Sequence, residues 1–233
     1  MKKRIQFCFT VLLLAVVLVA CGKNAASATM SSSSVSVDAA ASATTHADFS
    51  QSGFSQSADI SADSKVLVAY FSRAGENYNV GVVEKGSTEI LAELVAENTN
   101  GTLFHIETVN VYPESYEECK KVAIQERDSA ARPELTAGVE DLDTYDVIYL
   151  GYPIWYGDMP MAVYTFLESY DFTGKTIVPF CTHAGSGLAG TVNSIRTACK
   201  GATVLDGLAI PGTTVQKEPR KAQEQVNEFL NMS

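Results

Sequence analysis

The sequence predicts an α/β fold in which one parallel sheet has helices on both faces. From residue 65 onward, short apolar runs recur along the chain, and such runs are typical of strands that are buried on both sides. Segments with apolar residues at helical spacing lie between and after these runs. Because strands and helices alternate regularly, a doubly wound parallel sheet is the expected architecture.

Five strands are expected. The first, KVLVAYF at 65–71, is an almost continuous apolar run, as expected of a strand at the centre of a sheet. The other four are expected at 102–107, 145–150, 176–180 and within 202–210.

Five helices are expected to cover the sheet. The first has apolar residues at helical spacing over 90–95, and the last places Ala222, Val226, Phe229 and Leu230 on one face. The others are expected at 115–130, 161–170 and about 190–200.

The N-terminus has the pattern of a secretion signal. A basic start, MKKR, precedes the apolar run IQFCFTVLLLAVVLVA and then Cys21. Residues 1–21 resemble a bacterial lipoprotein signal peptide whose lipobox ends at Cys21, which implies lipidation at that residue and a membrane-anchored, extracytoplasmic location. The alternative is a retained transmembrane helix, since the apolar run is only slightly shorter than the ~20 residues of a span.

Residues 22–64 consist almost entirely of small and polar residues. Such a composition buries too little apolar surface to offset the entropy of ordering, so we expect a flexible tether. A coil of this length reaches about 30 to 40 Å. Residues 65–233 have a suitable length for a single domain with its own core.

Charge and cysteine content exclude some functions. Removing the signal takes away Lys2, Lys3 and Arg4 of the 17 basic residues, which leaves 14 against 27 acidic ones and a net charge of −13. This acidity argues against nucleic acid as a partner. Three cysteines remain in the domain, Cys119, Cys181 and Cys199, and their spacing matches no metal motif. We expect Cys181 and Cys199 to be small buried apolar residues.

In a parallel sheet of this kind, ligands bind beyond the carboxyl ends of the strands. The connection after the first strand is unusually long, covering 72–86, where two to six residues are usual. It begins with Ser72-Arg73-Ala74-Gly75 and ends with Gly86-Ser87-Thr88. Hydroxyls and free N–H groups at a helix N-terminus favour a phosphate, although Ser87 as a simple N-cap is the alternative.

The connections after the third and fourth strands complete the candidate site. The first of these, GYPIWYGDMP at 151–160, holds the only Trp of the chain between two prolines, which suits a flat ring as ligand. The alternative is an aromatic lid that packs on the domain itself. The second, CTHAGSG at 181–187, offers hydroxyls, an imidazole and glycines that allow close approach of the backbone.

With its FSRAGENY, GYPIWYG and CTHAGSG segments, the chain resembles the flavodoxin family, and in particular a branch of bacterial lipoprotein flavodoxin-like proteins. The resemblance runs from residue 65 to the C-terminus. It implies the strand order 2-1-3-4-5 and one noncovalently bound FMN. The phosphate loop of the family corresponds to Ser72, Arg73, Ala74 and Gly75, then Ser87 and Thr88, with 76–85 as an insertion within it. The flavin ring would lie against Pro153, Ile154, Trp155, Tyr156, Gly157, Thr182, His183, Gly185, Ser186 and Gly187.

The resemblance leaves three functions open. The first is a one-electron carrier, whose acidic surface would steer a basic redox protein or which would exchange electrons with a small molecule. The second is an NAD(P)H or quinone oxidoreductase in which His183 supplies a proton, or only orients the ring. No G-x-G-x-x-G segment follows the first strand, which disfavours a dedicated nicotinamide site. The third is a nonredox binding module that kept the fold.

Overall fold

The fold is seen in a computed structural model that describes residues 60–61 and 63–232. The expected signal peptide, its Cys21 and nearly all of the expected tether at 22–64 lie outside the described residues. Between residues 63 and 232 no helix has the length and apolar character to cross a bilayer.

The central sheet has the order β4-β1-β5-β6, and β6 pairs in turn with both β7 and β8. All of these pairings are parallel. This is the expected order 2-1-3-4-5, with β7 and β8 as two parts of the fifth strand. The strands are β1 (Val66–Tyr70), β4 (Thr102–His105), β5 (Val147–Pro153), β6 (Thr176–His183), β7 (Thr203–Val204) and β8 (Leu208–Pro211).

The expected single strand within 202–210 is therefore interrupted. Val204 pairs with Ile177 and Leu208 with Phe180, so three residues of the edge strand face only two of β6. One of those two is Pro179, which has no N–H to donate to a neighbouring strand. The edge strand therefore breaks opposite this proline.

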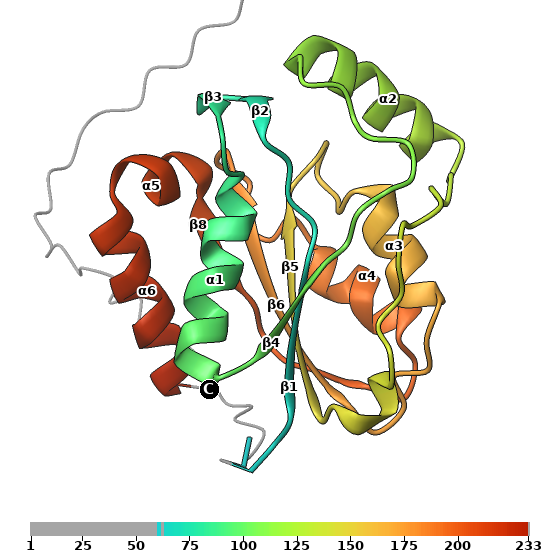
Figure 1. The fold of residues 1–233 in the computed structure, drawn as a ribbon, viewed down its shortest axis with the longest axis vertical. Coiled ribbons are helices and arrows are strands. Elements are labelled where there is room, and N and C mark those ends of the chain that lie inside the picture. The colour runs from blue at the N-terminus through green and yellow to red at the C-terminus, as the bar shows by residue number, and fades with distance from the viewer. Residues whose placement is uncertain (1–59, 62, 233) are drawn as a thin grey trace, which may run out of the picture. The chain divides into compact units, whose positions relative to one another are not determined.

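Helices cover both faces of the sheet (Figure 1). α1, α5 and α6 lie on one face and α3 and α4 on the other, while α2 lies beyond the carboxyl ends of the strands. The expected five helices are confirmed, and α5 is an additional short one. Their bounds are α1 (Ser87–Thr99), α2 (Tyr116–Asp128), α3 (Met161–Glu168), α4 (Thr191–Ala198), α5 (Gly212–Lys217) and α6 (Pro219–Met232). A short 3-10 turn, Leu142–Thr144, precedes β5.

The alternation of side chains along β1 divides the core into two clusters. Leu67 and Ala69 belong to the cluster under α3 and α4, together with Phe166 of α3. Val68 and Tyr70 belong to the cluster under α1 and α6. Because successive side chains of a strand point to opposite faces, the continuous apolar run of β1 fills both layers.

The long connection after β1 contains a β-hairpin that the sequence interpretation did not predict. β2 (Gly75–Asn77) and β3 (Gly81–Val83) pair antiparallel, so this hairpin makes up most of the insertion expected at 76–85. Asn79 and Gly81 have positive φ angles of 60° and 92°, which a tight turn requires. The hairpin stands beyond the carboxyl end of β1, near α2 (Figure 1).

Two strands extend further than expected. β5 continues through Pro153 and β6 through His183, because Pro153 pairs with Thr182 and His183 with Pro211 of β8. Residues 151–153 and 181–183 were expected in loops and instead form the ends of strands. These candidate site residues are therefore held by the sheet ladder.

Candidate functional site

A cleft of about 450 Å³ opens at the carboxyl ends of β1, β5 and β6, within the usual range for small-molecule sites. It has an inner part, formed by the ends of these strands and the N-terminus of α1, and an outer part, formed by the hairpin and α2. The three connections that were expected to meet at one end of the sheet do so here.

The structure brings most of the predicted site residues together. Those that line the cleft are Ser72, Arg73, Ser87, Thr88, Pro153, Ile154, Trp155, Tyr156, Thr182, His183 and Gly185. The others lie outside its lining, and they are Ala74, Gly75, Gly157, Ser186 and Gly187.

Gly157 and Gly75, which lie outside the lining, have backbone conformations or neighbours that require glycine. Gly157 has a φ of 79° and Tyr156 one of 53°, and Trp155 and Asp158 exchange two backbone hydrogen bonds across them. Positive φ at both central residues is the signature of a type I′ turn. Gly75 also has positive φ, and a Cβ there would lie 2.9 Å from the carbonyl oxygen of Glu114.

The N-terminus of α1 presents free backbone donors to the cleft. The N-cap is Gly86, which has no side chain to cap the helix, so the alternative of Ser87 as N-cap was wrong. The hydroxyl of Ser72 accepts the N–H of Glu89 at 3.1 Å. Among the described residues, no acceptor lies at the N–H groups of Ser87 and Thr88. Such groups favour an anion.

Gly86 permits a close approach between this helix and the end of β1. A Cβ at Gly86 would lie 2.1 Å from the Ser72 hydroxyl and 2.7 Å from the carbonyl oxygen of Arg73. Only glycine fits this packing, and it places the Ser72 hydroxyl against the first turn of α1. The residues present thus form a compact cradle of hydroxyls and N–H groups that suits a phosphate.

Thr88 and Thr182 join the helix to the sheet. Their buried hydroxyls are 2.8 Å apart, and Thr88 is the second residue of α1 while Thr182 lies in β6. Both were predicted as cofactor ligands. In the structure the two hydroxyls form a hydrogen bond with each other.

We expect Thr182→Val to lower the free energy of unfolding by about 1–2 kcal/mol in flavin-free protein, because the Thr88 hydroxyl loses its buried partner. The Thr88→Val/Thr182→Val double variant should lose less than the sum of the single variants. Urea denaturation of all four proteins measures this, and strictly additive losses would contradict the bond.

Arg73 was predicted as part of the phosphate loop. Its guanidinium donates to the carbonyl oxygens of Pro113, at 2.9 Å, of Glu114, at 3.0 Å, and of Glu76. The Nε atom is buried and has no hydrogen-bond partner in the part of the chain that the structure describes. Arg73 thus fastens the hairpin to the segment before α2, and its Nε is the donor that a ligand could still use.

The loop sequence had indicated an exposed ring at Trp155, but the structure does not show one. It packs edge-on against Phe71 and Tyr112, with ring centroids 5.3 and 5.2 Å apart. This packing is that of an aromatic lid on the domain itself, and Trp155 also lines the cleft. Only Tyr156 of this loop is an exposed large aromatic residue, at 41%.

Behind Trp155, the Tyr112 hydroxyl donates to a carboxylate oxygen of Glu126 at 2.6 Å. Burial raises the pKa of Glu126 more than this hydrogen bond lowers it. A raised pKa in the folded state means that the protonated acid favours folding. The stabilisation is complete below the ordinary value of 4.5 and is lost as the pH rises through the folded-state pKa.

Glu126→Gln should remove this pH dependence while its amide oxygen still accepts the Tyr112 hydroxyl. The Tm difference between variant and wild type should therefore move in favour of the variant between about pH 4 and about pH 8. Thermal denaturation across this range measures it, and a constant difference would show that Glu126 has no raised pKa.

The His183 ring is bonded to the main chain at two places. Nδ1 accepts the N–H of Gly185 at 2.9 Å, and the ring also has a hydrogen bond with the backbone of Ala209. Burial lowers the pKa of His183, against the smaller opposite effect of the Ala209 bond. These bonds fix the orientation of the ring and tie it to the turn that begins at Ala184.

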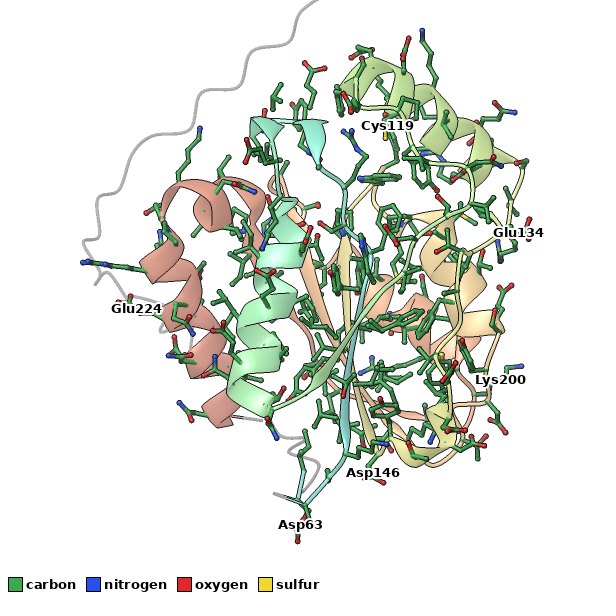
Figure 2. The ribbon with its side chains drawn as sticks, in the orientation of Figure 1. Asp63, Cys119, Glu134, Asp146, Lys200 and Glu224 are labelled. Atoms are coloured by element: carbon green, nitrogen blue, oxygen red, sulfur yellow. The ribbon has the colours of Figure 1, made fainter. Side chains whose placement is uncertain are left out.

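The three cysteines of the domain are free and buried. Burial raises the pKa of the Cys181 and Cys199 thiols to about 12, so both behave as the small apolar residues expected. Cys119 lies on α2 (Figure 2) and lines the cleft.

The outer part of the cleft was missed at the sequence level. It includes Asn77, Tyr78 and Val80 of the hairpin and Tyr116 and Lys120 of α2. The turn residues Asn79 and Gly81 could have indicated the hairpin, but no local signal places α2 over the end of the sheet. Gly212 and Thr213 also line the cleft, and their place after the fifth strand was a usable signal.

Comparison with known proteins identifies the family. A family model described as Flavodoxin matches residues 65–226. The chain belongs to the flavodoxin family. No curated protein matches it.

Solved structures share this flavodoxin fold. A candidate flavoprotein from Bacteroides uniformis is 30% identical with a TM-score of 0.56, covering 72% of this chain and 98% of its own. One from Bacteroides eggerthii is 26% identical with a TM-score of 0.57, covering 72% and 97%. A flavoprotein from Lactobacillus acidophilus, solved in complex with FMN, is 21% identical with a TM-score of 0.51, covering 66% and 97%.

Proposed function

We propose that this flavodoxin is an electron-transfer protein that binds one FMN in the cleft. The observation that carries the proposal is that the free N–H groups of Ser87 and Thr88 open into the same cleft as Trp155 and Tyr156. An anion site and a platform for a flat ring are the two parts that FMN requires. The family and the FMN complex of the Lactobacillus relative support it.

Each part of the cleft has its own task toward FMN. Ser87 and Thr88 would hold the phosphate through their N–H groups, with the Arg73 Nε as a further donor. Pro153–Tyr156 and Thr182–Gly185 would enclose the ring and keep water from it. When bound, FMN supplies the electron-transfer chemistry, and the protein sets the binding and the electrostatics.

The residues around the cleft favour the transfer of single electrons, without a proton donated by a side chain of the protein. His183 is held in place by two main-chain groups, and burial lowers its pKa, which supports an orienting role over a proton donor. Glu76, Glu114 and Glu117 are exposed on the hairpin and around the start of α2, next to the outer part of the cleft and outside its lining. Their charge raises the free energy of any added negative charge nearby. The same charge would steer a basic redox protein.

Potentiometric titration of the FMN-loaded protein tests this function. Two resolved one-electron steps would support a carrier. A single two-electron step, together with steady oxidation of NAD(P)H by a quinone, would favour an oxidoreductase instead. If the protein stays colourless when FMN is supplied, the nonredox binding module would be the remaining function.

The location forms part of the proposal. The signal-like residues 1–21 support a lipid anchor at Cys21, and a tether at 22–64 would let an extracytoplasmic domain reach partners near the membrane. Metabolic labelling with a radioactive fatty acid should mark the wild-type protein and not Cys21→Ser. Equal labelling of both would contradict the anchor.

A further inference from the structure

We propose that Tyr78, Tyr116 and Tyr156 form a second subsite in the outer part of the cleft, which binds a neutral planar aromatic molecule of the quinone class. This rests on the proposed function, because it names the chemical class of a small-molecule electron partner.

The three tyrosines form one continuous surface from separate elements. The rings of Tyr78 and Tyr116 lie with centroids 5.6 Å apart and planes 30° apart. Tyr116 also has a side-chain hydrogen bond with Tyr156. All three line the cleft, yet Tyr78 and Tyr116 lie on the hairpin and α2, outside the strand ends that form its inner part.

Several hydrogen bonds hold the hairpin against the start of α2 and so fix the position of this surface. Glu76 of the hairpin receives the backbone N–H of Tyr116 on its carboxylate at 3.0 Å and donates its own N–H to the carbonyl of Glu114 at 2.9 Å. Arg73 bonds to carbonyls on both sides of the same junction. Because this surface is ordered before the ligand binds, binding costs little conformational entropy.

Tyr78 is 59% exposed and Tyr156 41% exposed, so part of each side chain is accessible to a ligand. The Arg127 guanidinium lies 5.4 Å from the ring centroid of Tyr156 and restrains it. Aromatic faces prefer to stack on another flat ring. The wall therefore suits a planar aromatic ligand.

The polar groups of the wall define the class more closely. Residues 116, 119, 120 and 123 of α2 share one helical face and all line the cleft. Lys120 gives this face a cationic donor, 3.7 Å from Glu117. A ring with carbonyl oxygens can accept from Lys120 and from a tyrosine hydroxyl. The pyrophosphate of a nicotinamide dinucleotide would instead be repelled by the nearby carboxylates of Glu76, Glu114 and Glu117, which are exposed next to the cleft lining. The subsite therefore favours a neutral quinone over a dianionic dinucleotide.

Binding of duroquinone tests this subsite. Duroquinone is a fully methylated benzoquinone, so its ring carbons leave no open position for addition of the Cys119 thiol. It is titrated by calorimetry into flavin-free and FMN-loaded protein, wild type and Tyr78→Ala/Tyr116→Ala. Saturable binding should weaken at least about tenfold in the double variant, while the FMN dissociation constant stays within about twofold of wild type.

Val82→Ala is the matched control. Val82 lies on the same hairpin, is 81% exposed and is not part of the cleft lining, so this variant should bind duroquinone as wild type does. Absence of saturable binding, equal binding by the double variant, or tyrosine-dependent binding of NADH in place of duroquinone would overturn the subsite. If the proposed function is wrong, the FMN titration shows no saturable binding. The duroquinone titration of flavin-free protein does not depend on FMN, so it still tests whether the tyrosines bind a quinone.

Discussion

Ser87→Asp should lower the affinity for FMN by at least about 100-fold. The new carboxylate would stand at the first residue of α1, beside the N–H groups that would hold the phosphate. Two unit charges about 4 Å apart repel by about 4 kcal/mol at an effective dielectric constant of about 20, and each tenfold change in affinity corresponds to about 1.4 kcal/mol. Fluorescence titration of flavin-free protein with FMN measures the change.

Riboflavin provides the control for this variant because it has the ring without the phosphate. Its affinity should be nearly the same for Ser87→Asp and wild type. The Tm of the flavin-free variant should not fall, since an acidic residue in the first turn of a helix is favourable. If FMN and riboflavin lose affinity equally, the phosphate does not bind at this helix.

Gly86→Ala should also reduce FMN binding strongly, through shape instead of charge. Its φ of −65° suits any residue, but the added Cβ would meet the Ser72 hydroxyl at 2.1 Å and the Arg73 carbonyl at 2.7 Å. The end of β1 must then move away from α1. We expect a loss of stability of about 1–3 kcal/mol and FMN binding at least about 30-fold weaker, the equivalent of about 2 kcal/mol.

Gly212→Ala is the comparison for this effect. Gly212 also lines the cleft, yet its added Cβ would have its nearest neighbours at 3.4 Å, so stability and FMN affinity should change little. Denaturation in urea and FMN titration are applied to both variants. If Gly86→Ala binds FMN as well as Gly212→Ala does, the close packing at residue 86 does not shape the site.

The sequence allowed the sheet to be predicted because its signals are local. The run at 65–71 is apolar at almost every position, and the structure fills both core layers from it. Strand lengths were less accessible, because β6 is extended to His183 by pairing with β5 and β8. Pairing between distant segments leaves no mark in the local pattern.

In the candidate site, too, features with a local sequence signal could be predicted and features that depend on distant segments could not. The loops that hold Ser87, Trp155 and His183 were found because sheets of this kind bind ligands at the carboxyl ends of strands. The roles of single side chains were harder to predict. Arg73 turns to backbone carbonyls, and Trp155 packs between Phe71 and Tyr112. Both depend on residues that only the tertiary fold brings near.

Equilibrium titration of the flavin-free domain with FMN, followed by quenching of flavin fluorescence, measures whether the cleft is a flavin site. We expect saturation at one FMN per chain, with riboflavin binding more weakly because it lacks the phosphate that Ser87 and Thr88 would hold. Equal affinities for FMN and riboflavin would contradict the phosphate site. No saturable binding of either would contradict the assignment of this cleft to a flavin.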